Sequence, residues 1–190
     1  YCYRGGLRSQ IAQQWLADAG VERPRIRGGW KAMRQALCRR IDAAAEQPLL
    51  VVGGLTGCAK TALIQALSNG LDLEGCARHK GSAFGRHPLP APSQIDFEHA
   101  MGLRLLSLPG PLVVEDESRH IGAANVPLAF WRAMELAPRV RVEMPLDWRL
   151  AQIHKDYIDD LWAIYRQQFG EWLGWTLMRK QLSSALARLK

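Results

Sequence analysis

An apolar run that is followed directly by a glycine-rich segment restricts the fold of this chain more than any other part of the sequence. Residues 49–53, LLVVG, have the length and composition of a parallel strand that is buried on both faces. Glycines recur up to residue 57, and residues 60–68 then have the character of a helix. A strand, a glycine-rich turn and a helix in this order predict a phosphate-binding loop in an α/β domain.

The glycine-rich segment fits the Walker A pattern G-x-x-x-x-G-K-[ST] with one departure. Gly54, Lys60 and Thr61 are in register with the pattern, whereas Ala59 stands in the place of its last glycine. We expect the backbone N–H groups of the turn and the start of the next helix to bind phosphate, with Lys60 at the terminal phosphates. If Ala59 has a positive φ, its methyl group costs about 1 kcal/mol. The predicted phosphate-binding residues are Gly54, Thr56, Gly57, Cys58, Ala59, Lys60 and Thr61.

A second apolar run, LVV at residues 112–114, ends in the three carboxylates of Glu115, Asp116 and Glu117. P-loop proteins commonly take a carboxylate for Mg²⁺ from the end of a neighbouring strand, and the second protein ligand is the hydroxyl group of the loop. We therefore predict Mg²⁺ as a cofactor, with Thr61 and Asp116 as its ligands. Glu115 is the alternative carboxylate.

The start of the chain contains a second candidate site, CYRGGLRS at residues 2–9. A cysteine just before a helix has a lowered pKa, because the N–H groups of the turn and the positive end of the helix stabilise the thiolate. We predict Cys2 as a nucleophile, with Arg4 and Arg8 adding positive charge and Ser9 capping the helix. Such a loop suits a thiolate, a persulfide or a selenopersulfide.

The remaining pattern predicts an α/β layered domain with a mainly parallel sheet. The expected helices are residues 9–20, 30–46, 94–107, 127–137 and the segment after Pro145; the expected third strand is 139–144; and the expected loops are 70–92 and 118–125. We divide the chain into an N-terminal part at 1–46, a P-loop domain at 47–145 and a helical segment at 146–190. Because the chain begins inside the cysteine loop, we expect it to be part of a longer protein.

An excess of positive charge favours a polyanionic partner. With 25 Lys and Arg against 18 Asp and Glu, the formal net charge is +7. Arg78, His79 and Lys80 form a basic run after the phosphate site, and we predict them as RNA-binding residues. The four cysteines lack the spacing of a zinc site, which favours reduced thiols in the cytoplasm. No stretch reaches the roughly 18–20 apolar residues of a membrane helix, so we expect no membrane partner.

Several segments together resemble the tRNA 2-selenouridine synthase family, in which a rhodanese domain precedes a P-loop domain. CYRGGLRSQ at residues 2–10 resembles the active-site loop of rhodanese domains, and IRGGWKAMR at 26–34 resembles the segment that closes them. The other segments similar to the family are GLTGCAKT at 54–61, LEGCARHKGSAFG at 73–85, PSQIDFE at 92–98 and VEDESRHIG at 114–122. The resemblance implies a P-loop NTPase-like fold, preceded by the C-terminal part of a rhodanese-like domain and followed by a helical tail.

The resemblance also implies a transferase that modifies the wobble 2-thiouridine of tRNA in two steps. A geranyl group from geranyl diphosphate is placed on sulfur, and selenium from selenophosphate then replaces the geranylated sulfur. The P-loop is implied to hold the diphosphate, and Cys2 is implied to serve the selenation step. The implied partners are the anticodon region of tRNA and an enzyme that supplies selenophosphate. Candidate walls of an apolar groove for the geranyl tail are Phe84, Phe97, Leu128 and Trp131.

Two other classes of function fit the same residues. A small-molecule or nucleotide kinase would share the fold and bind ATP or GTP, although the chain has no second glycine-rich nucleotide signature. A phosphate-binding interaction module would have no catalytic activity. Binding measurements with a panel of nucleotides and geranyl diphosphate separate these classes from the transferase.

Binding of tRNA through charge predicts a steep dependence of affinity on salt. The logarithm of the affinity should fall in proportion to the number of phosphates contacted, because each contact releases counterions. Replacing Arg78 and Lys80 together should make that slope shallower in a salt titration followed by fluorescence anisotropy. An affinity that is independent of salt, or a slope that the double substitution leaves unchanged, would mean that these cations are only solvated surface.

Overall fold

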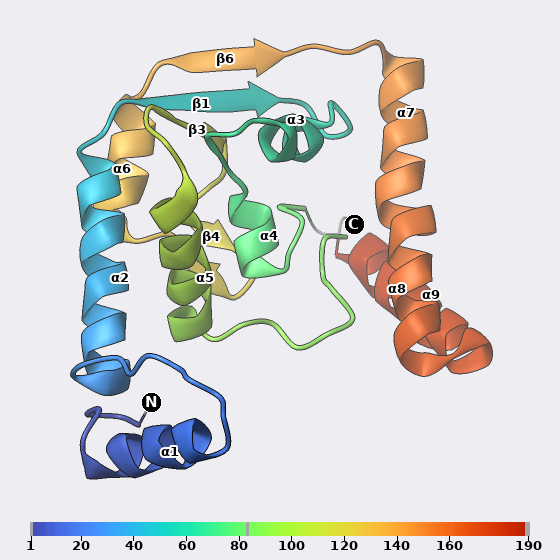
Figure 1. The fold of residues 1–190 in the computed structure, drawn as a ribbon. Helices are drawn as coiled ribbons and strands as arrows, with labels where there is room; N and C mark the ends of the chain where they lie inside the picture. Colours follow the sequence, from blue (N-terminus) through green and yellow to red (C-terminus); the bar gives the residue numbers. More distant parts are fainter. Residues whose placement is uncertain (1, 83, 189–190) are drawn as a thin grey trace.

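The computed structural model describes residues 2–82 and 84–188, and its centre is a four-stranded parallel sheet with the order β2-β3-β1-β6 (Figure 1). Strand β1 (Leu49–Gly54) pairs with β3 (Leu112–Glu115) on one side and with β6 (Arg139–Val142) on the other. The short strand β2 (Gly70–Leu71) extends the sheet beyond β3. These pairings confirm the predicted α/β fold with a mainly parallel sheet.

The side chains of β1 and β3 alternate between two apolar cores, as the period of two in a strand requires. Leu49 and Val51 of β1 and Val114 of β3 enter the larger core. Val52 and Val113 enter a smaller core on the opposite face. Burial on both faces explains why these strands read as continuous apolar runs in the sequence.

Helices cover the two faces of the sheet unequally. The larger core is closed by α2 (Gly29–Ala45), α5 (Gln94–Ser107) and α6 (Leu128–Leu136), which pack on one another and on the sheet. The opposite face is covered by α3 (Lys60–Ala66), whose Ile64 is fully buried. Helix α3 therefore holds the glycine-rich loop against the carboxyl end of β1.

After β6 the chain is helical up to residue 187, as predicted for the C-terminal segment. The elements are α7 (Leu146–His154), a π-helical turn η1 (Lys155–Asp159), α8 (Asp160–Phe169) and α9 (Glu171–Ala187). Helices α8 and α9 enclose a small core of their own around Leu161, Tyr165 and Met178. Figure 1 shows α7 beyond the carboxyl ends of β1 and β6. No helix within the described ranges is long and apolar enough to cross a membrane.

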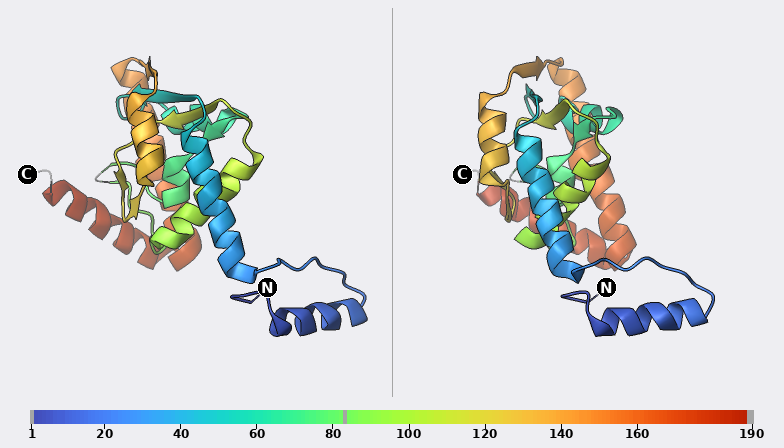
Figure 2. Two further views of the ribbon diagram at one scale, coloured as in Figure 1. Left: turned by 90° about the vertical axis from the view of Figure 1, so that its left-hand side faces the viewer. Right: turned by 60° about the vertical axis from the view of Figure 1, so that its left-hand side comes forward.

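The N-terminal segment is attached to the first turn of α2 by backbone hydrogen bonds. The N–H groups of Trp30 and Lys31 donate to the carbonyl oxygens of Cys2 and Tyr3 at 3.1 and 3.0 Å. Helix α1 (Leu7–Asp18) projects away from the rest of the chain (Figure 2). Its apolar side chains, such as Trp15 at 70% exposure, lie in solvent.

Some local expectations are wrong, and each concerns a very short element or a helix end. The loop expected at residues 70–92 contains β2 and the helix α4 (Leu73–Ala77), which Asp72 caps by accepting a hydrogen bond from the Gly75 N–H group at 2.6 Å. The loop expected at 118–125 contains the hairpin β4 (His120–Ile121) and β5 (Ala124–Asn125). Ser9 does not cap α1, which already begins at Leu7. Elements of two to five residues are too short to show a hydrophobic period.

Neighbouring leucines of α5 provide a test of the larger core. Leu105 is fully buried, whereas Leu106 is 63% exposed. Leu105→Ala should lower the free energy of unfolding by about 2–5 kcal/mol, because it removes buried methyl groups and leaves a cavity. The control Leu106→Ala should change it by less than about 0.5 kcal/mol. Urea unfolding of both variants checks the difference, and equal losses would contradict the packing described here.

Candidate functional site

The glycine-rich loop passes so close to neighbouring backbone that two of its positions admit only glycine. Gly54 has a φ of +152°, and a Cβ atom there would lie 2.7 Å from the carbonyl oxygen of Val142 in β6. Gly57 has a φ of +83°, and a Cβ atom there would lie 2.5 Å from the carbonyl oxygen of Arg149 in α7. Both contacts are closer than real Cβ atoms show, so β6 and α7 together shape the loop.

Ala59, the residue that departs from the Walker A pattern, has a left-handed backbone with φ +54° and ψ +34°. Glycine adopts this conformation without steric cost, whereas the Cβ atom of alanine disfavours it by about 1 kcal/mol. The Walker A pattern has glycine here because the backbone must be left-handed, and this chain adopts that conformation with alanine, which disfavours it. The required turn forms nonetheless, immediately before α3 begins at Lys60.

The side chains of Lys60 and Thr61 both contact groups that line the loop. The Lys60 ammonium group donates to the carbonyl oxygen of Gly54 at 3.0 Å, and the Thr61 hydroxyl donates to Glu74 Oε2 at 3.1 Å. A cavity of about 340 Å³, which we call the phosphate pocket, lies against the loop. Of the predicted phosphate-binding residues, the pocket is lined by Thr56, Gly57, Cys58, Ala59, Lys60 and Thr61.

The far wall of the phosphate pocket comes from segments that the sequence analysis did not connect with the loop. Glu74 of α4, residues 80–82 and Glu117 form one part of this wall. The other part comes from α7, η1 and the start of α8, namely Gln152, Lys155, Asp156, Tyr157 and Asp160. The sequence of the C-terminal helices carries no motif that places them here, so only the tertiary fold reveals this contribution.

Three carboxylates after β3 have different environments. Burial raises the pKa of Glu115 to about 8, and burial together with the nearby Glu74 raises the pKa of Glu117 to about 7. Glu115 is therefore mostly protonated at pH 7. Asp116 instead contacts strand β6, where its Oδ1 is 3.6 Å from Nε of Arg139. The assignment of Asp116 as a magnesium ligand stays a prediction. The carboxylates that interact with the Thr61 hydroxyl are those of Glu74, at 3.1 Å, and Glu115.

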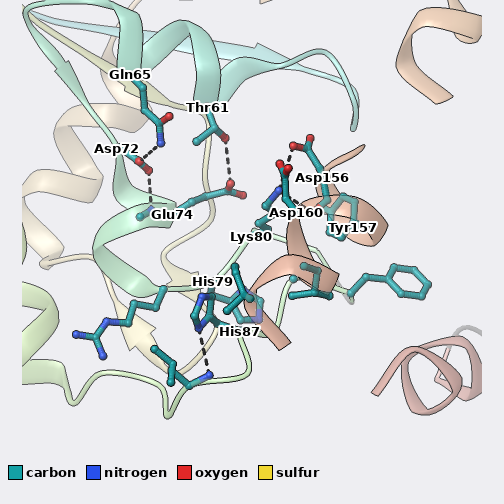
Figure 3. Close-up of a pocket in the computed structure, with 17 residues that line it drawn as sticks. Thr61, Gln65, Asp72, Glu74, His79, Lys80, His87, Asp156, Tyr157 and Asp160 are labelled. Atoms are coloured by element: carbon teal, nitrogen blue, oxygen red, sulfur yellow. Dashed lines mark hydrogen bonds and ion pairs between the residues drawn. The ribbon is translucent and has the colours of Figure 1, made fainter. Parts of the chain in front are cut away.

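A second cavity, of about 390 Å³, adjoins the phosphate pocket (Figure 3); most of its exposed wall surface is apolar, although many of the side chains that line it are polar or charged. We call it the apolar pocket. Figure 3 shows the Thr61 side chain directed at Glu74 and the Lys80 side chain beside Asp156 and Asp160. The residues that line both cavities are Thr61, Gln65, Glu74, Lys80, Asp156, Tyr157 and Asp160.

The apolar side chains that line the apolar pocket include those of Phe84, Leu89, Leu161 and Ile164. His79 and His87 also line it, and burial lowers the pKa of both, so they are neutral at pH 7. Of the four candidate groove walls, only Phe84 lines this pocket. Phe97 is fully buried in the larger core, Trp131 packs against that core, and neither Leu128 nor Trp131 lines the apolar pocket.

The basic run at residues 78–80 faces the two pockets. Arg78 is exposed, and its side chain and that of His79 line the apolar pocket. The ammonium group of Lys80 lies 3.1 Å from Asp156 Oδ1 and 5.3 Å from the centre of the Tyr157 ring. A role in RNA binding stays a prediction for all three residues.

The Cys2 thiol lies in a loop that stabilises its ionised form. A hydrogen bond from the Ser9 hydroxyl lowers the pKa of Cys2 most, and backbone N–H groups of Gly6, Arg4 and Gly5 add to this effect, bringing it to about 6. The thiolate therefore predominates at pH 7. The sequence predicts the contribution of the N–H groups of the turn, with positive charge from Arg4 and Arg8, but it does not reveal the contribution of the Ser9 hydroxyl.

The cysteine loop and the phosphate pocket are separate sites. Figure 1 shows the start of the chain below α2, whereas the glycine-rich loop lies at the carboxyl end of β1, on the far side of the sheet. Helix α2 alone has 17 residues and so spans about 25 Å. Cys2, Cys38, Cys58 and Cys76 are all free thiols. Among the described residues, no group of three or more His, Cys, Asp or Glu side chains is placed to hold a metal ion.

The left-handed turn at Ala59 predicts that one substitution toward the pattern stabilises the chain. Ala59→Gly should raise the free energy of unfolding by up to about 1 kcal/mol, because it removes the Cβ atom that disfavours the left-handed backbone. The control Ala62→Gly, inside α3, should lower it by about 1 kcal/mol. Urea unfolding measures both, and a loss of stability in Ala59→Gly would contradict the left-handed turn.

Comparisons with known proteins agree with this combination of loop and fold. Residues 47–190 match the family model described as the tRNA 2-selenouridine synthase AAA domain. A protein named tRNA 2-selenouridine synthase from Chromohalobacter salexigens is 69% identical over 190 residues, which are 100% of this chain and 53% of that protein. Proteins of the same name from Aeromonas salmonicida and Photobacterium profundum are 47% and 44% identical, over 100% and 98% of this chain and 53% and 52% of theirs.

The matches cover nearly all of this chain but only about half of each relative. No solved structure matches the chain. The chain spans about half the length of the curated relatives it matches. The family model nevertheless covers all of the sheet, the glycine-rich loop and the C-terminal helices. The chain belongs to the tRNA 2-selenouridine synthase family.

Proposed function

We propose that the protein to which this chain belongs converts the wobble 2-thiouridine of tRNA to 2-selenouridine through a geranylated intermediate. Geranyl diphosphate would bind at the glycine-rich loop, and selenophosphate would supply selenium at a second centre. The name of the relatives supports tRNA modification with selenium. The observation that best supports geranyl diphosphate is the apolar pocket that opens onto the phosphate pocket.

The two adjoining pockets suit a ligand with a charged head and an apolar tail. The phosphate pocket offers Lys60 and the backbone of the glycine-rich loop to a diphosphate. The apolar pocket offers Phe84, Leu161 and Ile164 to a hydrocarbon chain. Both volumes lie within the range of small-ligand sites. The largely apolar wall surface of the second pocket supports a prenyl diphosphate over a nucleotide as the ligand.

The chemistry of geranyl transfer fits the groups at the loop. The sulfur of 2-thiouridine attacks the first carbon of the geranyl group, the bond between that carbon and the diphosphate oxygen breaks, pyrophosphate leaves, and the N3 proton of the base passes to solvent. Negative charge grows on the leaving oxygens during this step. Lys60 and the N–H groups of the loop would stabilise that charge as it develops, which lowers the barrier.

Mg²⁺ fits the same pocket as a proposed cofactor. Magnesium usually takes one or two protein carboxylates together with phosphate oxygens and water, so it does not need a complete protein cage. The Thr61 hydroxyl and the carboxylate of Glu74 are in contact, and within the described residues the buried Oε1 of Glu115 has no hydrogen-bond partner. Thr61 and Glu74, which both line the pocket, would hold the ion, or Thr61 and Asp116 as the sequence predicts; Glu115 would first have to lose its proton. A bound Mg²⁺ would neutralise charge on the diphosphate.

Cys2 would serve the selenation step at the second centre. A thiolate is the reactive form of cysteine, and the low pKa of Cys2 provides it at neutral pH. The anticodon region of tRNA would have to reach both centres, and Arg78, His79 and Lys80 border the first of them. The reaction places the protein in the cytoplasm with tRNA and with an enzyme that supplies selenophosphate.

Two substitutions in the full-length protein should block different steps. Lys60→Ala should weaken geranyl diphosphate binding at least about 100-fold, because it removes the cation at the diphosphate, and no geranylated tRNA should form. Cys2→Ser should leave geranylation unchanged but prevent selenation, so that geranylated tRNA accumulates. Mass spectrometry of tRNA incubated with geranyl diphosphate and selenophosphate measures both products.

Two matched controls separate these effects from general damage. Lys31→Ala removes an exposed lysine of α2, and Cys38→Ser removes a cysteine of the same helix; both should behave as the unmodified protein. Wild-type affinity in Lys60→Ala would refute the assignment of the phosphate loop. Seleno-tRNA formed at the normal rate by Cys2→Ser would refute the role of Cys2. Preferential binding of ATP or GTP would favour a kinase.

A further inference from the structure

Helix α7 is fixed to the tip of the glycine-rich loop. The Arg149 Nε group donates to the carbonyl oxygen of Thr56 at 3.0 Å, and the backbone of Arg149 lies against Gly57. The position of α7 is therefore set by the loop itself. The attachment of α7 to the loop also fixes the position of η1 and the start of α8, which follow α7 and line the phosphate pocket.

The π-helical turn η1 follows α7 without a break and changes which side chains face the pocket. A π-helical turn pairs residues i and i+5, whereas an α-helix pairs i with i+3 or i+4. Two side-chain pairs have this i,i+5 spacing: the ion pair of Lys155 with Asp160 at 2.8 Å, and the contact of His154 Nδ1 with Asp159 Oδ2 at 3.4 Å. The turn places both members of the first pair on the wall of the phosphate pocket.

Three lysines from separate elements line the phosphate pocket, and each is bound to an acceptor of the protein. Lys60 donates to the Gly54 carbonyl oxygen, Lys80 pairs with Asp156, and Lys155 pairs with Asp160. The pair of Lys155 and Asp160 is well exposed, with side-chain exposures of 59% and 47%. Exposed ion pairs contribute little to stability, so this lysine can change partner at small cost.

We propose that Lys155 binds the terminal phosphate of the ligand held on the glycine-rich loop, and that it leaves Asp160 to do so. A terminal phosphate carries more negative charge than a single carboxylate and offers several acceptor oxygens, so it competes well for the ammonium group. The loop and Lys60 approach the ligand from one side, and η1 brings the second cation to the opposite wall. This inference rests on the proposed function of the phosphate pocket.

Binding of inorganic pyrophosphate to the full-length protein, measured by isothermal titration calorimetry, tests the role of Lys155. Lys155→Met should raise the Kd about tenfold, since one charged hydrogen bond is lost. Lys155→Arg should stay within about threefold of the unmodified protein, because the charge remains. Arg179→Met removes an exposed cation of α9, outside the pocket, and should leave the Kd unchanged.

A double-mutant cycle tests whether Asp160 competes with phosphate for Lys155. Asp160→Asn should lower the Kd for pyrophosphate about threefold, because Lys155 no longer has to leave an anionic partner. In the Lys155→Met background, Asp160→Asn should have no effect. The same gain in both backgrounds would mean that Asp160 only repels the anion, and this would overturn the proposed exchange.

The failure of this inference can be told apart from the failure of the proposed function. If Lys60→Ala abolishes pyrophosphate binding and Lys155→Met leaves it unchanged, the phosphate loop is upheld and the role of Lys155 is refuted. If Lys60→Ala binds pyrophosphate normally, the phosphate pocket itself is wrong. Loss of binding in Lys155→Arg as well as in Lys155→Met would show a structural role for the exposed pair and would also refute the proposal.

Discussion

The parallel pairing of β1 with both of its neighbours fixes where a ligand can meet this fold. Val52 lies opposite Glu115 in β3, and Gly54 lies opposite Val142 in β6, so the three strands end at one edge. The glycine-rich loop, the acidic turn and the approach to α7 all leave the sheet there. Ligands of open parallel sheets bind beyond the carboxyl ends of the strands, and the phosphate pocket of this chain lies against the loop that leaves β1 there.

Several hydrogen-bond donors at this edge are already bound to carboxylates of the protein. Thr61, Lys80 and Lys155 each contact a carboxylate, those of Glu74, Asp156 and Asp160. Any ligand has to compete with these carboxylates for the same donors. A weak anion gains little from the exchange, whereas a diphosphate brings enough charge to replace several partners at once. Competition from these carboxylates would therefore favour ligands of high negative charge, such as the proposed diphosphate, over weaker anions.

The sequence predicts those parts of the site whose chemistry depends on neighbouring residues, and it misses those that depend on the tertiary fold. The loop from Gly54 to Thr61 is visible because its conformation and its charge are local requirements. The contribution of η1 cannot be seen in the sequence. Lys155 follows Lys60 by 95 residues, and no local pattern indicates that both line the same pocket. The sequence predicts Ser9 as the cap of the helix, whereas its hydroxyl interacts with Cys2. Cys2 lies in the loop before the helix, where helical spacing says nothing about its neighbours.

The length of α2 has a kinetic consequence for the proposed two-step reaction. The helix starts at the cysteine loop and spans about 25 Å, so a nucleotide cannot exchange one reactive centre for the other by rotating in place. In the proposed reaction the geranylated tRNA would have to move between the two centres, and during that movement it would either reach the Cys2 thiolate or dissociate. The ratio of these two rates would set the processivity of the proposed reaction. Geranylated tRNA in the cell would then measure how often the transfer fails.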